Sequence, residues 1–105
     1  MSTATYGGVQ VTVNDEGFFI DPSAWTPAMA EEMAKADGID QLSERHWTVI
    51  NFMRKEYFEK GTGPTVRMLG KTSGVSVKDL YLLFPKGPAK MAAHIAGIPK
   101  PKGCI

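Results

Sequence analysis

The pattern of hydrophobic and polar positions divides the chain into a short β-region and a longer helical region. Val9, Val11 and Val13 alternate with polar residues, which predicts a half-buried strand. Residues 14–17 (Asn-Asp-Glu-Gly) favour a turn, and residues 18–20 (Phe-Phe-Ile) are predicted to return as the second strand. The start of the chain is therefore predicted to be a β-hairpin, and the rest to be helical.

Helix-capping residues, prolines and glycines mark the first two predicted helices. The first begins at Pro27, with Thr26 as its N-cap, and ends at Gly38. The second follows Ser43 and ends at residues 60–61. Its apolar residues form a stripe too wide for a surface helix, which predicts the central helix of the core. These residues are Trp47, Val49, Ile50, Phe52, Met53, Tyr57 and Phe58.

Residues 64–83 have the pattern of a helix-turn-helix. A third helix is predicted over residues 64–72, Gly74 suits the turn, and Ser76 caps a fourth helix that Pro85 ends. As a DNA-reading motif the pattern is weak, because Lys78 is the only basic residue where base contacts are made and Asp79 would repel phosphate. We expect weak, sequence-independent nucleic-acid binding, and a nucleic-acid-binding regulator stays open as a rival function.

The last part of the chain is predicted to be a helix followed by an arm. The helix runs from Pro88 to Gly97, and prolines at 99 and 101 prevent its continuation. We expect residues 1–97 to form a single domain and residues 98–105 to form a solvated, flexible C-terminal arm. The seven residues from Gly97 to Cys104 give an extended arm a reach of roughly 25 Å.

The single cysteine, Cys104, is the penultimate residue of this arm. A free cysteine is usually buried, so a thiol on a solvated arm points to a use in chemistry. Lys100 and Lys102 would favour its thiolate, whereas the carboxylate at the end of the chain opposes it. Strong activation of Cys104 would therefore require the arm to dock against Arg67, Lys71 or a partner protein.

Composition narrows the class of protein. With 105 residues, 43% hydrophobic and 22% charged, the chain fits one folded domain. It has neither a secretory signal nor an apolar run of the ~20 residues that a membrane helix needs, and its single cysteine fits a reducing cytoplasm. One cysteine and two histidines argue against a metal site, and no cofactor motif is present. We expect His46 and His94 to be structural or solvated, although His94 could approach a docked arm.

The small net charge of +1 conceals an asymmetry along the chain. Residues 1–45 carry eight acids and two bases, which is −6, and residues 46–105 carry three acids and ten bases, which is +7. A basic half indicates an anionic ligand, a nucleic acid or an acidic partner surface. Mutual neutralisation of the two halves in the fold is the alternative, and the sequence leaves both open.

Several motifs together carry a family resemblance. They are residues 83–90 (LFPKGPAK), residues 95–101 (IAGIPKP) and the ending Gly-Cys-Ile, with residues 44–47, 64–69 and 15–18 and Trp25 in support. The chain resembles the DsrC/TusE family, which contains the gamma subunit of dissimilatory sulfite reductase and the TusE sulfur-relay protein. The resemblance implies a mainly α fold, a small helical bundle with an N-terminal β-hairpin, a helix-turn-helix core and a flexible C-terminal arm.

The same resemblance implies that Cys104 carries sulfur, as a persulfide or a mixed sulfur species, between proteins. Family members that act with dissimilatory sulfite reductase have a second cysteine eleven positions before the penultimate one, where this chain has Ala93. Single-cysteine members resemble the TusE type, which relays persulfide sulfur toward thiolation of the tRNA wobble uridine. The resemblance thus implies a sulfurtransferase-type carrier that is not a stand-alone enzyme and needs no cofactor.

The partners implied are proteins that donate and accept sulfur, namely sulfur-relay proteins, a tRNA thiolase or a sulfite reductase, with no membrane involved. Arg67, Lys71, Lys100 and Lys102 are the residues expected to stabilise anionic sulfur or to bind acidic partners. Two alternatives stay open beside the relay. The chain could be a gamma subunit that inserts its arm into sulfite reductase, or a helix-turn-helix regulator.

Overall fold

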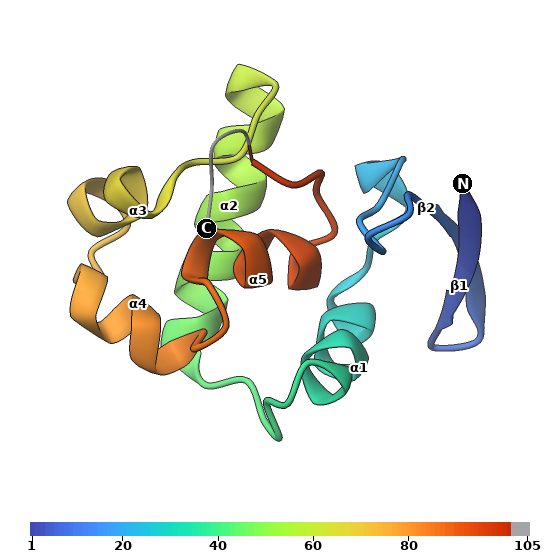
Figure 1. The fold of residues 1–105 in the computed structure, drawn as a ribbon, viewed down its shortest axis with the longest axis horizontal. Helices are drawn as coiled ribbons and strands as arrows, with labels where there is room; N and C mark the ends of the chain where they lie inside the picture. Colours follow the sequence, from blue (N-terminus) through green and yellow to red (C-terminus); the bar gives the residue numbers. More distant parts are fainter. Residues whose placement is uncertain (102–105) are drawn as a thin grey trace.

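The computed structural model describes residues 1–101, where a β-hairpin precedes five α-helices (Figure 1). The hairpin consists of β1 (Ser2–Tyr6) and β2 (Val9–Val13), and a 3-10 turn, η1 (Pro22–Ala24), leads into the helices. These are α1 (Pro27–Ala36), α2 (Glu44–Lys60), α3 (Val66–Thr72), α4 (Val77–Leu83) and α5 (Pro88–Ile95). The expected mainly α fold with an N-terminal hairpin is confirmed.

The helix at the centre of the core is α5, and the prediction that α2 occupies this place is wrong. Figure 1 shows α5 in the middle of the molecule, and it packs against α1, α2, α3 and α4. Its alanines, Ala89, Ala92 and Ala93, are completely buried. Small side chains let several helices approach one axis closely, so a short alanine-rich helix occupies the centre better than a long aromatic one.

The helix α2 lies beside α5 and buries only one side. Val49, Ile50 and Met53 are inaccessible to solvent, but Phe58 is 58% exposed, which corrects its assignment to the core. The start of α2 is as predicted. The Ser43 hydroxyl accepts the His46 backbone N–H at 3.3 Å, and the His46 Nδ1 accepts the Ser43 backbone N–H at 3.0 Å. Because the His46 Nε2 also lies 2.9 Å from the Leu83 carbonyl oxygen, His46 is a structural residue that joins α2 to α4.

The β-hairpin forms, but with a different partner strand from the one predicted. The strand β2 pairs with β1, and Tyr6 lies opposite Val9 across a two-residue Gly-Gly turn. Both turn glycines have positive φ, 58° and 78°, as a tight hairpin turn requires. Of the predicted second strand, only Phe19 makes an isolated bridge, to Val13. The Asn14 side chain closes the intervening turn by accepting the Glu16 and Phe18 N–H groups.

The helices α3 and α4 form the predicted pair around a glycine turn. Gly74 has φ +85°, and the Ser76 hydroxyl caps α4 by accepting the Asp79 N–H at 3.2 Å. The two helices touch where Gly70 meets Val77, since a Cβ on Gly70 would lie 2.4 Å from a Val77 methyl carbon. The missing side chain at Gly70 therefore allows the two helices to cross closely. Among residues 1–101, no helix is long and apolar enough to cross a membrane.

Candidate functional site

The residues that lead from α5 toward Cys104 form the root of the arm (Gly97–Pro101). Gly97 adopts a left-handed conformation with φ +69°. Its N–H donates to the His94 carbonyl, and the Ile98 N–H donates to the Ala93 carbonyl, each at 3.1 Å. This pair of bonds is a Schellman motif, which satisfies the free carbonyls at the end of α5. The direction in which the chain leaves the core is thereby fixed by backbone hydrogen bonds.

The root is packed against the protein, which corrects the expectation of a solvated arm from residue 98 onward. Ile98 is completely buried and Pro101 is also buried, whereas Lys100 is exposed. A Cβ added at Gly63 would lie 2.9 Å from the Ile98 Cδ1 and 3.2 Å from the Pro101 Cγ. The missing side chain at Gly63, in the loop between α2 and α3, thus provides the space in which the root sits.

Trp25 and Arg54 hold the carboxyl end of α5 by hydrogen bonds to its last carbonyl groups. The Trp25 Nε1 donates to the Ile95 carbonyl at 2.9 Å, and an Arg54 Nη1 donates to the Ala96 carbonyl at 2.7 Å. The Arg54 guanidinium also stacks over the Trp25 ring, 4.1 Å from its centroid. Partial burial lowers the pKa of Arg54. A cation at the carboxyl end of a helix interacts favourably with the negative end of the helix dipole, so this contact both orients and stabilises the end of α5.

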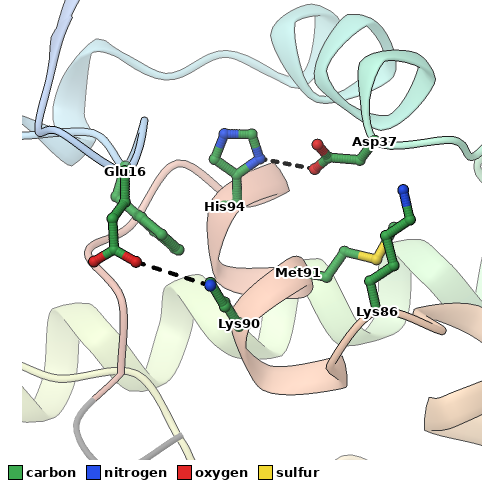
Figure 2. A pocket seen from close by; sticks show the side chains of 7 residues that line it. Glu16, Asp37, Lys86, Lys90, Met91 and His94 are labelled. Atoms are coloured by element: carbon green, nitrogen blue, oxygen red, sulfur yellow. Dashed lines mark hydrogen bonds and ion pairs between the residues drawn. The ribbon is translucent and has the colours of Figure 1, made fainter. Parts of the chain in front are cut away.

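Lys100 is bound by an acid from the other end of the sequence. Its Nζ lies 3.2 Å from a Glu16 carboxylate oxygen, and the Nζ of Lys90 lies 3.8 Å from the same oxygen. Figure 2 shows Glu16 directed at Lys90 on α5. One carboxylate thus links the arm root, α5 and the loop after β2. The negative and positive halves of the sequence partly neutralise each other here, as the alternative interpretation of the charge asymmetry expected.

A cavity of about 260 Å³ lies beside this carboxylate. It is lined by Glu16, Phe18, Asp37, Lys86, Lys90, Met91 and His94 (Figure 2). Its titratable groups are largely paired with one another. The His94 Nδ1 lies 2.8 Å from an Asp37 carboxylate oxygen, and Phe18 packs edge-on against the imidazole. These contacts hold His94 in a structural role.

Of the predicted site residues, the described structure places three. Lys100 belongs to the arm root, where Glu16 binds it, whereas Arg67 and Lys71 are exposed on α3 and form no ion pair within residues 1–101. Lys102 and Cys104 lie outside the described residues. The predicted cations thus belong to two different parts of the fold, α3 and the arm root, and only Lys100 among the three has an ion-pair partner within residues 1–101.

Sequence reasoning missed the residues that position the root, namely Trp25, Arg54, Gly63 and Glu16. A local signal did exist for the root itself. A glycine after the last helical residue followed by an apolar residue is typical of a Schellman motif with its hydrophobic contact, and Gly97-Ile98 fits it. The partners of that contact are distant in sequence, and no local pattern reveals them.

Comparison with known proteins agrees with this geometry. The model of the DsrC like protein family matches residues 5–105. The chain belongs to the DsrC family. The sequence is 38% identical over 105 residues to the gamma subunit of the dissimilatory-type sulfite reductase of Nitratidesulfovibrio vulgaris, with both chains covered completely. It is 43% identical over 108 residues to the sulfurtransferase TusE of Pectobacterium atrosepticum, covering 95% of this chain and 97% of that one.

Solved structures of DsrC proteins have the same fold as this family member. A structure of dissimilatory sulfite reductase I superposes with a TM-score of 0.87 and 35% identity, covering 99% of this chain and 100% of that chain. The solution structure of DsrC from Allochromatium vinosum gives a TM-score of 0.81 and 43% identity, covering 98% and 97%. The resemblance seen in the sequence is confirmed for both the family and the fold.

Proposed function

We propose that this protein is a sulfur carrier that accepts and donates sulfane sulfur on Cys104. The observation that carries the proposal is the combination of DsrC-family membership with a penultimate cysteine that is the single thiol of the chain. Relatives named as a sulfurtransferase and as a sulfite reductase gamma subunit both support a role in sulfur transfer. The protein acts as a carrier between other proteins.

The chemical step requires a single thiolate and a persulfide donor. The Cys104 thiolate attacks the outer sulfur of the donor persulfide, an S–S bond forms to Cys104, and the donor S–S bond breaks. The donor leaves as a thiolate, which takes up the proton. An acceptor thiolate reverses the process by attacking the outer sulfur on Cys104. No electrons are gained or lost overall, so the transfer needs no redox cofactor.

The packed root shortens the expected reach of the thiol. With Pro101 held against Gly63, three residues connect the anchored chain to Cys104, which allows a span of about 10 Å. The sequence-based reach of roughly 25 Å was counted from Gly97 and holds only if the root detaches. We propose that a partner meets Cys104 close to the surface formed by the root and Lys100. Lys102, which lies outside the described residues, would help to stabilise anionic sulfur or to bind the partner.

The absence of a second thiol favours the relay type over the sulfite-reductase type. Position 93 is occupied by alanine, and no other cysteine exists in the sequence. Sulfur on Cys104 therefore cannot be released by an internal disulfide and requires an external thiol. We propose transfer between proteins of a sulfur relay, with tRNA thiolation as the destination that the sequence resemblance to the TusE type implies. Service as a gamma subunit of sulfite reductase is the second candidate, on the strength of the full-length relative.

Mass spectrometry of the intact protein tests the proposal. Incubation with a small-molecule persulfide should add about 32 Da, one sulfur atom, and reductant should remove it. Cys104→Ser should remain unmodified, because a serine hydroxyl is not ionised near neutral pH. The loaded wild-type protein should keep its sulfur after the donor is removed and lose it when an external thiol is added. A wild-type protein that stays unmodified under conditions that load a known persulfide carrier would contradict the proposal.

A further inference from the structure

The outer side of the helix pair α3 and α4 is an exposed surface that combines charged and apolar side chains. The α3–α4 face consists of Arg67 and Lys71 on α3, and of Val77, Lys78 and Tyr81 on α4. All five residues are exposed, and the two apolar ones keep a large accessible fraction, 43% for Val77 and 45% for Tyr81. Exposed apolar side chains among charges are typical of a protein interaction surface.

Helical geometry places these residues on one continuous surface. Arg67 and Lys71 are four residues apart, as are Val77 and Tyr81, so each pair shares one side of its helix. The helices meet at Gly70 and Val77. On α3, Arg67 and Lys71 lie within one helical turn of Gly70, so both cations and Val77 are exposed near the crossing of the two helices (α3 and α4 in Figure 1).

The charged residues of the face are all positive. Its three cations form no ion pair within the described part of the chain. The one acid on the two helices, Asp79, is occupied by Arg45 of α2, with 2.8 Å between the guanidinium and carboxylate atoms. Arg45 thus neutralises the charge that would otherwise oppose an acidic ligand, and a positive face with an apolar strip remains.

We infer that the α3–α4 face docks an acidic protein surface that carries apolar side chains beside its carboxylates. The assignment rests on the proposed function, since the natural occupant would be a protein that exchanges sulfur with Cys104. A nucleic acid fits less well. Affinity for a duplex backbone comes mainly from many cation–phosphate contacts, to which Val77 and Tyr81 would add little. In addition, α4 has no arginine, asparagine or glutamine to contact base edges.

Backbone amide NMR of the full chain with a synthetic peptide tests the inference. The probe is a helical peptide with glutamates on one side and leucines beside them, compared with a peptide in which serines replace the leucines. Shift changes should centre on the five residues of the face, and the serine peptide should bind several-fold more weakly. Changes that centre elsewhere, or equal binding of the two peptides, would overturn the inference.

Matched charge reversals separate a specific face from general attraction. Arg67→Glu with Lys71→Glu should weaken binding of the leucine peptide at least tenfold. Lys35→Glu with Lys55→Glu changes the net charge equally at exposed positions on α1 and α2 and should weaken it much less. Equal weakening by both pairs would overturn the inference. Tyr81→Ser tests the apolar part independently and should weaken binding several-fold, even if the reversed pair does not fold.

Other occupants of the face are distinguished in the same spectra. Duplex RNA or DNA that binds more tightly than the leucine peptide at equal salt would overturn the inference in favour of a nucleic acid. Shifts of the same amides on dilution of the chain alone would instead assign the face to a second copy. Persulfide loading of Cys104 is measured separately. Loading without peptide binding would reject the docking face alone, and binding without loading would reject the carrier.

Discussion

The arm root and the α3–α4 face both contain cations for which the sequence predicts the same role, binding of anionic sulfur or of an acidic partner. Their surroundings in the fold differ. At the root, Lys100 lies between two buried residues, Ile98 and Pro101, and is bound by Glu16. On the α3–α4 face, Arg67 and Lys71 lie beside half-exposed apolar side chains and have no partner within residues 1–101. At the root the contacts therefore position the chain, whereas the cations of the face make no such contact within residues 1–101.

The sharpest test of this comparison substitutes alanine for one glycine in the root and for one in the turn between α3 and α4. Gly97 and Gly74 both have positive φ, but a Cβ on Gly97 would lie 2.3 Å from the Trp25 ring, whereas a Cβ on Gly74 would meet nothing within 4 Å. Gly97→Ala should lower the free energy of unfolding by about 4 kcal/mol, and Gly74→Ala by about 1 kcal/mol. Urea denaturation measures both, and equal losses would show that the root is no more tightly packed than the turn.

A second test removes one apolar side chain from the root and one from α4, outside the five residues of the face. Ile98→Ala should destabilise by about 3 kcal/mol, because it empties a completely buried position next to Gly63. Leu82→Ala should change stability by less than about 0.5 kcal/mol, because Leu82 is 72% exposed on α4. Thermal and urea unfolding provide the comparison. A neutral Ile98→Ala would support the sequence-based expectation of a solvated arm from residue 98 onward.

A third test removes the ion pairs of the root. Glu16→Gln deprives Lys100 and Lys90 of their shared carboxylate and should lower stability by about 0.5 kcal/mol at low salt, as expected for exposed ion pairs. The difference from wild type should shrink in ~1 M salt, where exposed charges are screened. Glu31→Gln, at an exposed position on α1, is the control. A salt-independent loss would show that Glu16 acts through packing.

The smallest expected effect concerns the pair beside the α3–α4 face, and it appears only in acid. The hydrogen bond from Arg45 lowers the pKa of Asp79 below its ordinary value of 3.8. Because the pKa in the folded state is the lower one, the stabilisation is present above pH 3.8 and is lost as pH falls through the folded pKa. The stability difference between wild type and Arg45→Gln should therefore disappear in acid, which unfolding measured across this range checks. A difference that persists there would assign Arg45 another role.

Local signals in the sequence predicted most helix boundaries. Ser43, Ser76 and Pro88 mark the starts of α2, α4 and α5, and Gly74 marks the turn between α3 and α4, because capping and left-handed positions restrict the residue type. The apolar pattern predicts the wrong partner strand for the hairpin, because residues 18–20 (Phe-Phe-Ile) are more apolar than the true partner, β1 (Ser-Thr-Ala-Thr-Tyr). Phe18 and Phe19 are buried, but they belong to the core under the hairpin.

The helices, the family and the single thiol can be derived from the sequence alone, since each depends on residues that are close together or on the composition of the whole chain. Which helix is central and where the arm leaves the core depend on tertiary contacts. The pairing of Lys100 with Glu16, which distinguishes it from Arg67 and Lys71, is also a tertiary contact. The contacts responsible join distant residues, such as Glu16 to Lys100 and Trp25 to the end of α5. Such contacts form when the chain closes on itself, and the free energy that selects them comes from packing and burial across the whole domain.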